Sequence, residues 1–157
     1  MKNIMENISK NITFENWIDY KGKEVFKIEN TPNEEQIANG KLIAENIFEA
    51  LITEFGEVVK IENGFLNSYL NSIIEKNLNF NDGDALKISA NINTTINAEI
   101  FNYIKDNLEF DTLIWMYGSY KRPQFIYVSY ISNNRKQVLK TQYNKELKKT
   151  EYINFEQ

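Results

Sequence analysis

The densest group of side chains that could bind a metal lies between residues 77 and 84. Asn77, Asn79, Asn81, Asp82 and Asp84 offer amide and carboxylate oxygens, the ligands that Ca²⁺ prefers. The spacing is not that of an EF-hand loop. Counting from Asn77, no glycine stands at the sixth position and no glutamate at the twelfth. We interpret the segment as a solvated polar loop and predict no metal site there.

Two absences narrow the chemistry further, because the chain contains no histidine and no cysteine. Zinc sites are built from imidazole and thiolate ligands, usually with a carboxylate. Serine and cysteine hydrolases usually rely on a histidine base. The sequence therefore excludes the commonest zinc and nucleophile–base chemistries, and no other catalytic motif is present. We expect no cofactor, no metal and no disulfide.

Length, composition and charge indicate what class of protein this is. A chain of 157 residues with 42% hydrophobic and 13% aromatic residues predicts one globular domain with a proper core. The net charge of −4 gives no generic attraction to nucleic acid or to an anionic membrane, so we expect neither as a partner. No apolar run is long enough to cross a bilayer. The first ten residues lack the apolar stretch of a signal peptide, which predicts synthesis in a cytoplasm without export.

The elements that would position any site follow from local patterns. Thr31, Pro32 and Glu34 predict a capped helix start, and Gly56 predicts its end. Further helices are predicted over 68–74 and 95–108, and strands over 58–61, 85–92, 113–117, 125–131 and 135–141. This order predicts an α+β domain over residues 1–141, with amphipathic helices packed on an antiparallel sheet. Residues 142–157 are charged and mixed, and we expect a mobile tail or docking arm there rather than a nucleic-acid contact.

Several segments, in order, resemble the zinc D-Ala-D-Ala carboxypeptidase family in its phage endolysin form. Residues 28–35 resemble its lead-in IDNTPNEE, and 59–71 resemble V-x-I-x-S-G-[YF]-R-S-x-x-L-N. Residues 97–115 resemble its helix followed by D-Q-L-I-W-E. Residues 123–130 resemble P-x-W-[VI]-H-V-S-Y, and 137–139 resemble its closing G-Q-V-L. The resemblance implies the hedgehog/DD-peptidase fold.

The same resemblance implies that the catalytic site is degenerate. It places Phe80, Lys87 and Tyr127 where family members have the histidine, aspartate and histidine that bind zinc. It places Leu66 where an arginine would hold a substrate carboxylate, and Met116 where the acidic general base would stand. Phe80 has no lone pair for a cation, Lys87 carries a charge that repels Zn²⁺, and Met116 accepts no proton. We therefore expect a pseudoenzyme without zinc.

Two interpretations of the altered cleft stay open. In the favoured one, these residues refill the vacated space as core. In the other, the cleft has a new ligand, for which Lys87 and Tyr127 would be the polar groups.

For the whole protein we expect a non-catalytic structural or interaction protein of a tailed phage. It would be a capsid, decoration or other virion accessory component, made in the host cytoplasm and present in many copies beside other virion proteins. We expect its contact zones in the aromatic region 115–130 and after Gln142. One alternative is a non-hydrolytic module that binds peptidoglycan peptides, although Leu66 offers their carboxylate no partner. The other, less favoured, is a residual cell-wall peptidase, which no motif supports.

Overall fold

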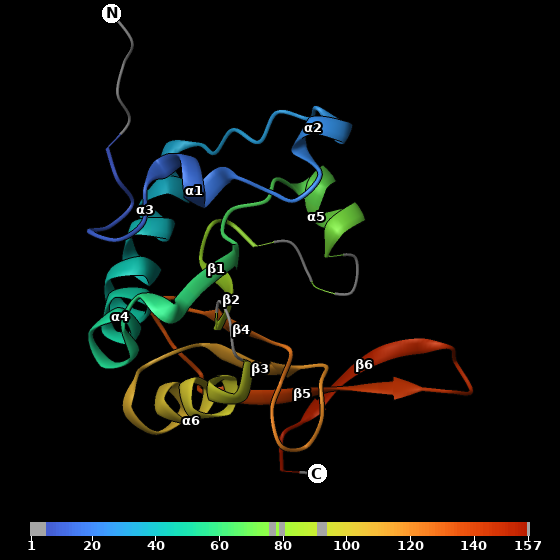
Figure 1. Ribbon diagram of the computed structural model, residues 1–157. Coiled ribbons are helices and arrows are strands. Elements are labelled where there is room, and N and C mark those ends of the chain that lie inside the picture. The colour runs from blue at the N-terminus through green and yellow to red at the C-terminus, as the bar shows by residue number, and fades with distance from the viewer. Residues whose placement is uncertain (1–5, 76–77, 79–80, 91–93, 157) are drawn as a thin grey trace, which may run out of the picture.

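The fold is a six-stranded sheet with helices packed mainly on one face (Figure 1). The computed structural model describes residues 6–75, 78, 81–90 and 94–156. The strand order is β1-β2-β4-β3-β5-β6. The strands are β1 (Val59–Asn63), β2 (Ala85–Ala90), β3 (Thr112–Met116), β4 (Phe125–Ser129), β5 (Gln137–Asn144) and β6 (Lys149–Asn154). The predicted α+β class is confirmed, and the five predicted strands occur with ends shifted by a few residues.

The sheet is mixed, so the prediction of an antiparallel sheet was wrong for one pair. β3 runs parallel to β5 and antiparallel to β4, so the chain leaving β4 passes across the end of β3 to reach β5. Two backbone bonds fix this passage: the Lys136 amide donates to the Phe110 carbonyl at 3.1 Å, and the Gln137 amide donates to the Asp111 carbonyl at 2.8 Å. Strand periodicity reports where strands occur but not which strands become neighbours.

The long helix predicted from residue 31 to 55 is present as three consecutive segments. These are α3 (Glu34–Ile43), a π-helical turn η1 (Ala44–Phe48) and α4 (Glu49–Phe55). Its cap is Asn33 rather than Thr31, because Asn33 Oδ1 accepts from the Gln36 amide at 2.8 Å while Gln36 Oε1 accepts from the Asn33 amide at 2.9 Å. Gly56 ends the helix with a positive φ of 80°, as predicted.

The other helices are short except for α6. They are α1 (Phe14–Ile18), α2 (Lys23–Phe26), η2 (Gly56–Val58), α5 (Ser68–Ile74), η3 (Thr94–Ile96) and α6 (Asn97–Asn107). The predicted helix over 68–74 is present as α5, and Asn67 caps it by accepting from the Leu70 amide at 2.8 Å. In the described part of the chain, no helix combines the length and the apolar character that crossing a membrane requires.

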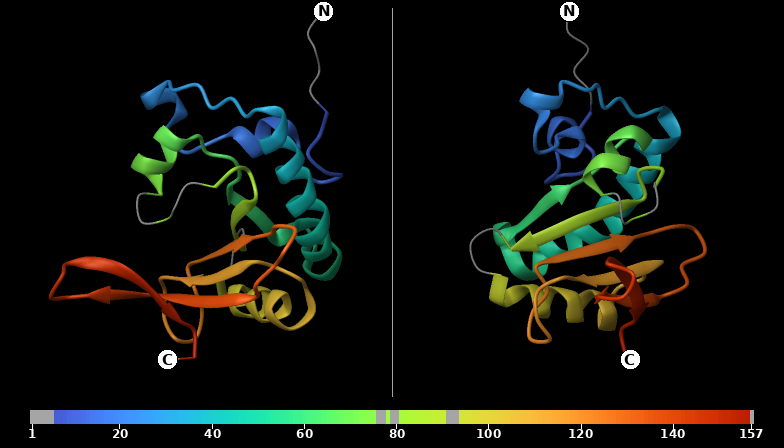
Figure 2. Two further views of the ribbon diagram at one scale, coloured as in Figure 1. Left: turned by 180° about the vertical axis from the view of Figure 1, so that it is seen from behind. Right: turned by 90° about the vertical axis from the view of Figure 1, so that its right-hand side faces the viewer.

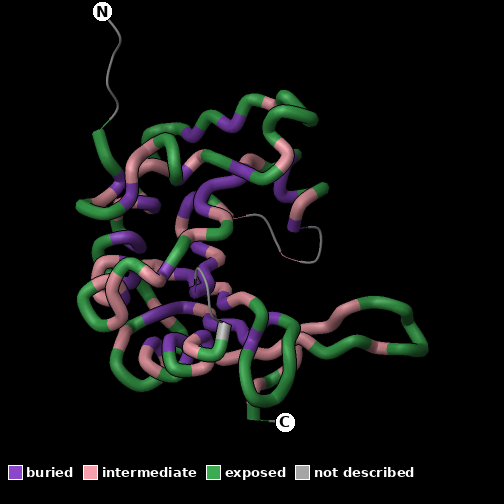
Figure 3. Tube along the Cα trace, in the orientation of Figure 1, coloured by how far each residue is buried: buried purple, intermediate pink, exposed green. Residues whose placement is uncertain are grey.

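One main core lies between the sheet and the helices α3, η1, α4 and α6 (Figures 2 and 3). Inward residues alternate along the strands, with Leu86 and Ile88 on β2 and Ile126 and Val128 on β4. Trp17 on α1 is fully buried in this core. A Cβ atom at Gly40 would lie only 2.3 Å from the Trp17 ring, so the glycine inside α3 makes room for that side chain.

Residues 142–154 form a hairpin, where we expected a mobile tail. β5 runs through the expected boundary at residue 141, and it pairs with β6 from Leu139 with Asn154 to Asn144 with Lys149. Figures 1 and 2 show this hairpin extending beyond the body of the molecule. The physical reason is that residues 149–153 place Thr150 and Tyr152 in alternation with the charges and add Ile153, a composition that suits a paired strand better than a solvated end. Whether this arm docks onto a partner stays a prediction.

Candidate functional site

The sheet face opposite the main core carries the candidate site. Residues that alternate with the inward ones point to this face, and they include Lys87 on β2 and Tyr127 on β4. Lys87 and Tyr127 are directly opposed in the antiparallel register of these two strands. The structure therefore brings together two of the three positions at which the sequence resemblance places zinc ligands. The third, Phe80, lies outside the described residues.

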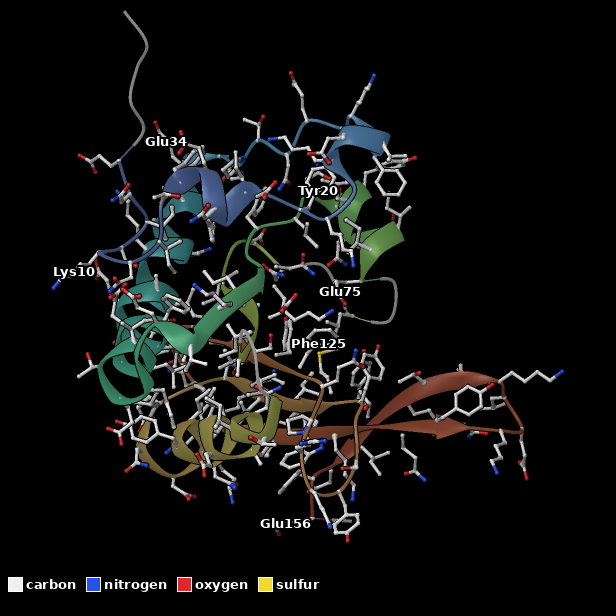
Figure 4. All side chains as sticks on the ribbon, viewed as in Figure 1. Lys10, Tyr20, Glu34, Glu75, Phe125 and Glu156 are labelled. Atoms are coloured by element: carbon white, nitrogen blue, oxygen red, sulfur yellow. The ribbon has the colours of Figure 1, made fainter. Side chains whose placement is uncertain are left out.

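Lys87 forms a close ion pair with a residue that the sequence analysis did not single out. Its Nζ lies 2.6 Å from Glu75 Oε1, and the two side chains are only 15% and 10% exposed. Asn63 Nδ2 donates to the same carboxylate oxygen at 2.9 Å. The Lys87 ammonium also lies 4.2 Å from the centre of the Phe125 ring. Figure 4 shows Glu75, at the end of α5, facing the sheet near Phe125.

These contacts compensate the charge of Lys87 within the protein itself. The ammonium has a carboxylate partner and an aromatic face, and the carboxylate has two donors, so both charges are compensated. We call Asn63, Glu75, Lys87 and Phe125 the lysine cluster. It contains one acidic residue and a cation, a donor set that does not suit a divalent metal. Within the described residues, no group of three or more acidic side chains is arranged to hold a metal ion.

Tyr127 lies beside the lysine cluster and is half-buried. Burial raises the pKa of its phenol, and the negative charges of Asp84, Asp111 and Glu75 raise it further. The hydroxyl therefore stays protonated across the neutral range. A neutral phenol is a hydrogen-bond donor and a poor metal ligand.

The two remaining predicted positions are buried. Met116 is fully buried at the end of β3 and is directly opposed to Phe125, which confirms the expected burial of Met116. Leu66 is also buried and packs in a small second cluster with Tyr20 and Leu70. Both side chains are therefore part of the packed interior.

A groove of about 570 Å³ runs along the same face, between the polar loop before β2 and the base of the β5–β6 hairpin. Asp82, Asp84, Asp111, Arg135 and Tyr152 are among its lining residues. Arg135 donates to Asp111 through Nε and Nη2, both at 2.9 Å, and this pair lowers the pKa of Asp111. Burial raises the pKa of Asp84, and the charges of Asp82 and Asp111 add to the effect.

The polar loop is tied to helix α3. Asn39 Nδ2 donates to the Asp82 carbonyl at 2.9 Å, Gln36 Nε2 donates to Asp82 Oδ1 at 3.3 Å, and Asn81 Oδ1 accepts from the Gly83 amide at 2.9 Å. These oxygens accept hydrogen bonds that hold the loop in place, and they are not directed at a common point as the ligands of a metal ion would be. Asn77 and Asn79, the other members of the calcium hypothesis, lie outside the described residues.

Sequence reasoning missed Glu75, Asn63, Asp111 and Arg135. Glu75 follows the last turn of a short helix, and no motif marks it. Asp111 and Arg135 are separated by 24 positions, and only the passage of the chain across β3 brings them together. Comparison with protein-family models, with curated proteins and with solved structures found no match.

Proposed function

We propose that this chain is a non-catalytic structural or interaction protein built on an inactivated zinc-peptidase-like fold, and that it serves in the particle of a tailed phage. The lysine cluster is the observation that carries the first half of the proposal. An ion pair stands where the resemblance implies an aspartate ligand, and it is held on both sides by Asn63 and Phe125. The phage half rests on the sequence resemblance to endolysins alone.

The chemistry of the cleft supports a role without turnover. Hydrolysis by a zinc peptidase needs a metal-bound water and a general base. Lys87 replaces an anionic ligand by a cation, and buried Met116 stands where the base is implied. Both residues suit a packed protein. Lys87 compensates the nearly buried carboxylate of Glu75, and Met116 fills space in the interior.

Metal content and hydrolysis test the loss of catalysis. The purified chain is expected to hold no stoichiometric zinc by elemental analysis and to leave purified peptidoglycan uncut. A variant with Phe80→His, Lys87→Asp and Tyr127→His should gain zinc binding yet stay inactive, because the base at Met116 is still missing. Zinc in the unmodified protein, or release of peptides from the cell wall, would refute the proposal.

Composition of purified phage particles tests the second half. Mass spectrometry of particles from a producing host is expected to find the chain in many copies per particle. Absence from particles that contain the other structural proteins would remove the virion role and leave the loss of catalysis unaffected.

A non-hydrolytic peptide-binding module is the second candidate, and the groove is the observation that favours it. Its rim carries Arg135, whose side chain is exposed although Asp111 occupies two of its donors. A peptide carboxylate would have to compete with Asp111 for that guanidinium. Titration with a peptidoglycan stem peptide, followed by amide shifts in NMR spectra, separates the candidates. Shifts confined to residues of the groove would favour the module, and unchanged spectra at millimolar peptide would exclude it.

A further inference from the structure

The charge of the chain is divided sharply along the sequence. Residues 117–157 contain eight lysines and arginines against three glutamates, a net charge of +5. Residues 1–116 contain ten lysines and arginines against nineteen acidic residues, a net charge of −9. The segment with the positive net charge contains the β3–β4 connection and the β5–β6 hairpin, and two of its cations, Arg135 and Lys136, pair with Asp111 and Glu109 of the acidic segment. An anionic partner would be repelled by most of the molecule and attracted to this basic segment.

A groove of about 740 Å³ lies between the β3–β4 connection and the hairpin. Four aromatic residues are among those that line it: Trp115, Tyr117, Tyr120 and Tyr143. Tyr120 is 89% exposed and Tyr143 is 60% exposed, so these rings present large uncovered faces. We call this feature the tyrosine groove. Exposed aromatic rings in such a density mark a binding surface rather than a chance feature of the surface.

Tyr117 and Tyr120 belong to a hydrogen-bonded turn, whereas Tyr143 belongs to β5. The Trp115 indole donates to the Ser119 carbonyl at 3.0 Å, and the Ser119 amide donates to the Arg122 carbonyl at 3.0 Å. The Tyr117 amide donates to Thr141 Oγ1 at 2.7 Å, which ties the turn to β5. Such a pre-ordered surface loses little conformational entropy when a ligand binds.

Cations occur in both chain segments that border the tyrosine groove, the β3–β4 connection and the β5–β6 hairpin. Lys121 and Arg122 belong to the turn, and Lys145, Lys148 and Lys149 belong to the tip of the hairpin. Within the part of the chain that the structure describes, none of these five forms an ion pair with a carboxylate. The Lys121 ammonium lies 5.9 Å from the centre of the Tyr120 ring, so a cation and a stacking face stand together.

We propose that the tyrosine groove binds single-stranded nucleic acid, with bases stacked on Tyr120 and Tyr143 and phosphates held by the flanking cations. Every base offers a flat π face, and sites for single strands combine such aromatic rings with a basic path along the backbone. An acidic peptide would use the cations and leave the exposed rings without a function. The proposal revises the expectation from net charge that nucleic acid is excluded. It holds whether or not the chain is part of a particle.

Fluorescence anisotropy with a labelled 10-nucleotide oligothymidine tests the stacking. The full chain should bind it at about 50 mM salt, where phosphate contacts are strong, and bind an abasic oligomer of equal length and charge at least tenfold more weakly. Tyr120→Ala should weaken binding about fivefold or more. Tyr69→Ala is the matched control, because Tyr69 is 62% exposed on α5, away from the groove, and it should change nothing. Equal affinity for the abasic oligomer, or no binding at low salt, would overturn the proposal.

Charge reversal tests the cations in the same assay. Each neutralised phosphate contributes about −0.7 to the slope of log K against log salt for single strands, so Lys121→Glu with Arg122→Glu should flatten the slope by about one unit or more. Lys60→Glu on β1, an exposed lysine of the acidic region, should leave the slope unchanged. Polyglutamate that displaces the oligomer as well as unlabelled oligothymidine does would show a general polyanion surface, and would refute a site for nucleic acid.

Discussion

Removing the cation of the lysine cluster should strongly destabilise the fold. Lys87→Met keeps an unbranched side chain against Phe125 and deletes the ammonium 2.6 Å from Glu75 Oε1. Glu75 would then be a nearly buried carboxylate that still accepts a hydrogen bond from Asn63 but has lost its cation. Breaking a buried pair from one side typically costs about 3–5 kcal/mol. The side chains keep 10–15% of their exposure, so we expect the lower end, about 3 kcal/mol.

Urea denaturation measures this loss directly. With a urea dependence of about 1–3 kcal/mol per molar, a loss of about 3 kcal/mol lowers the midpoint by roughly 1–3 M. Lys41→Met is the matched control, because Lys41 pairs with Glu6 at 3.1 Å on the surface, and exposed pairs contribute about 0–1 kcal/mol.

A second substitution tests the cause of the loss. Adding Glu75→Gln to Lys87→Met removes the stranded charge and keeps an acceptor for Asn63, so the double variant should recover more than half of the loss. A cost below about 1 kcal/mol for Lys87→Met would show that water screens the pair and would refute the reasoning. A double variant no better than the single one would place the effect in packing against Phe125 rather than in charge.

Three further predictions concern stability. Asp111→Asn should destabilise at pH 7, because Arg135 lowers the pKa of Asp111 below its ordinary 3.8. The stabilisation is complete above that value and is lost as the pH falls through the lowered folded-state pKa, so the urea midpoints of variant and wild type should converge as the pH falls through it. Gly40→Ala should lower the melting temperature, since its Cβ would lie 2.3 Å from Trp17 and overpacking costs about 1–3 kcal/mol; an unchanged melting temperature would mean that the ring moves freely. Met116→Ala should cost about 2–5 kcal/mol in urea denaturation, as for other fully buried side chains, and a loss below about 1 kcal/mol would contradict its role as core.

Local features of the fold were predictable because they depend on neighbours in sequence. The extent of α5 and the end of the long helix at Gly56 could be predicted, since helix starts and ends are set within one turn. The cap of α3 was misplaced by two residues because Thr31-Pro32-Asn33 offers two residues able to cap, and Asn33 forms the reciprocal bonds with Gln36. The π-helical turn within the long helix left no signal in the pattern.

The arrangement of the strands and the site depended on contacts between distant residues. The parallel pairing of β3 with β5 is stabilised by the Asp111–Arg135 pair, which no local pattern reveals. Lys87 and Tyr127 were singled out through a family motif, and β2–β4 pairing places them opposite one another. Glu75, the ion-pair partner of Lys87, comes from the end of a different element, α5. The hairpin could not be predicted from local patterns for the same reason. Residues 142–154 belong to the sheet because β5 pairs with β3 and β6 pairs with β5.

The position of β3 inside the sheet has a consequence for synthesis. β3 receives its second neighbour only when β5, beginning at Gln137, has been made. A chain that stops earlier, through a premature stop codon or cleavage, would expose β3 as an edge strand of Thr-Leu-Ile-Trp-Met without any charge. The natural edges β1 and β6 each carry a lysine and a glutamate, residues that discourage pairing with other chains. Truncation should therefore give an aggregating product rather than a shorter soluble one, and the C-terminal hairpin protects the nascent protein as well as completing it.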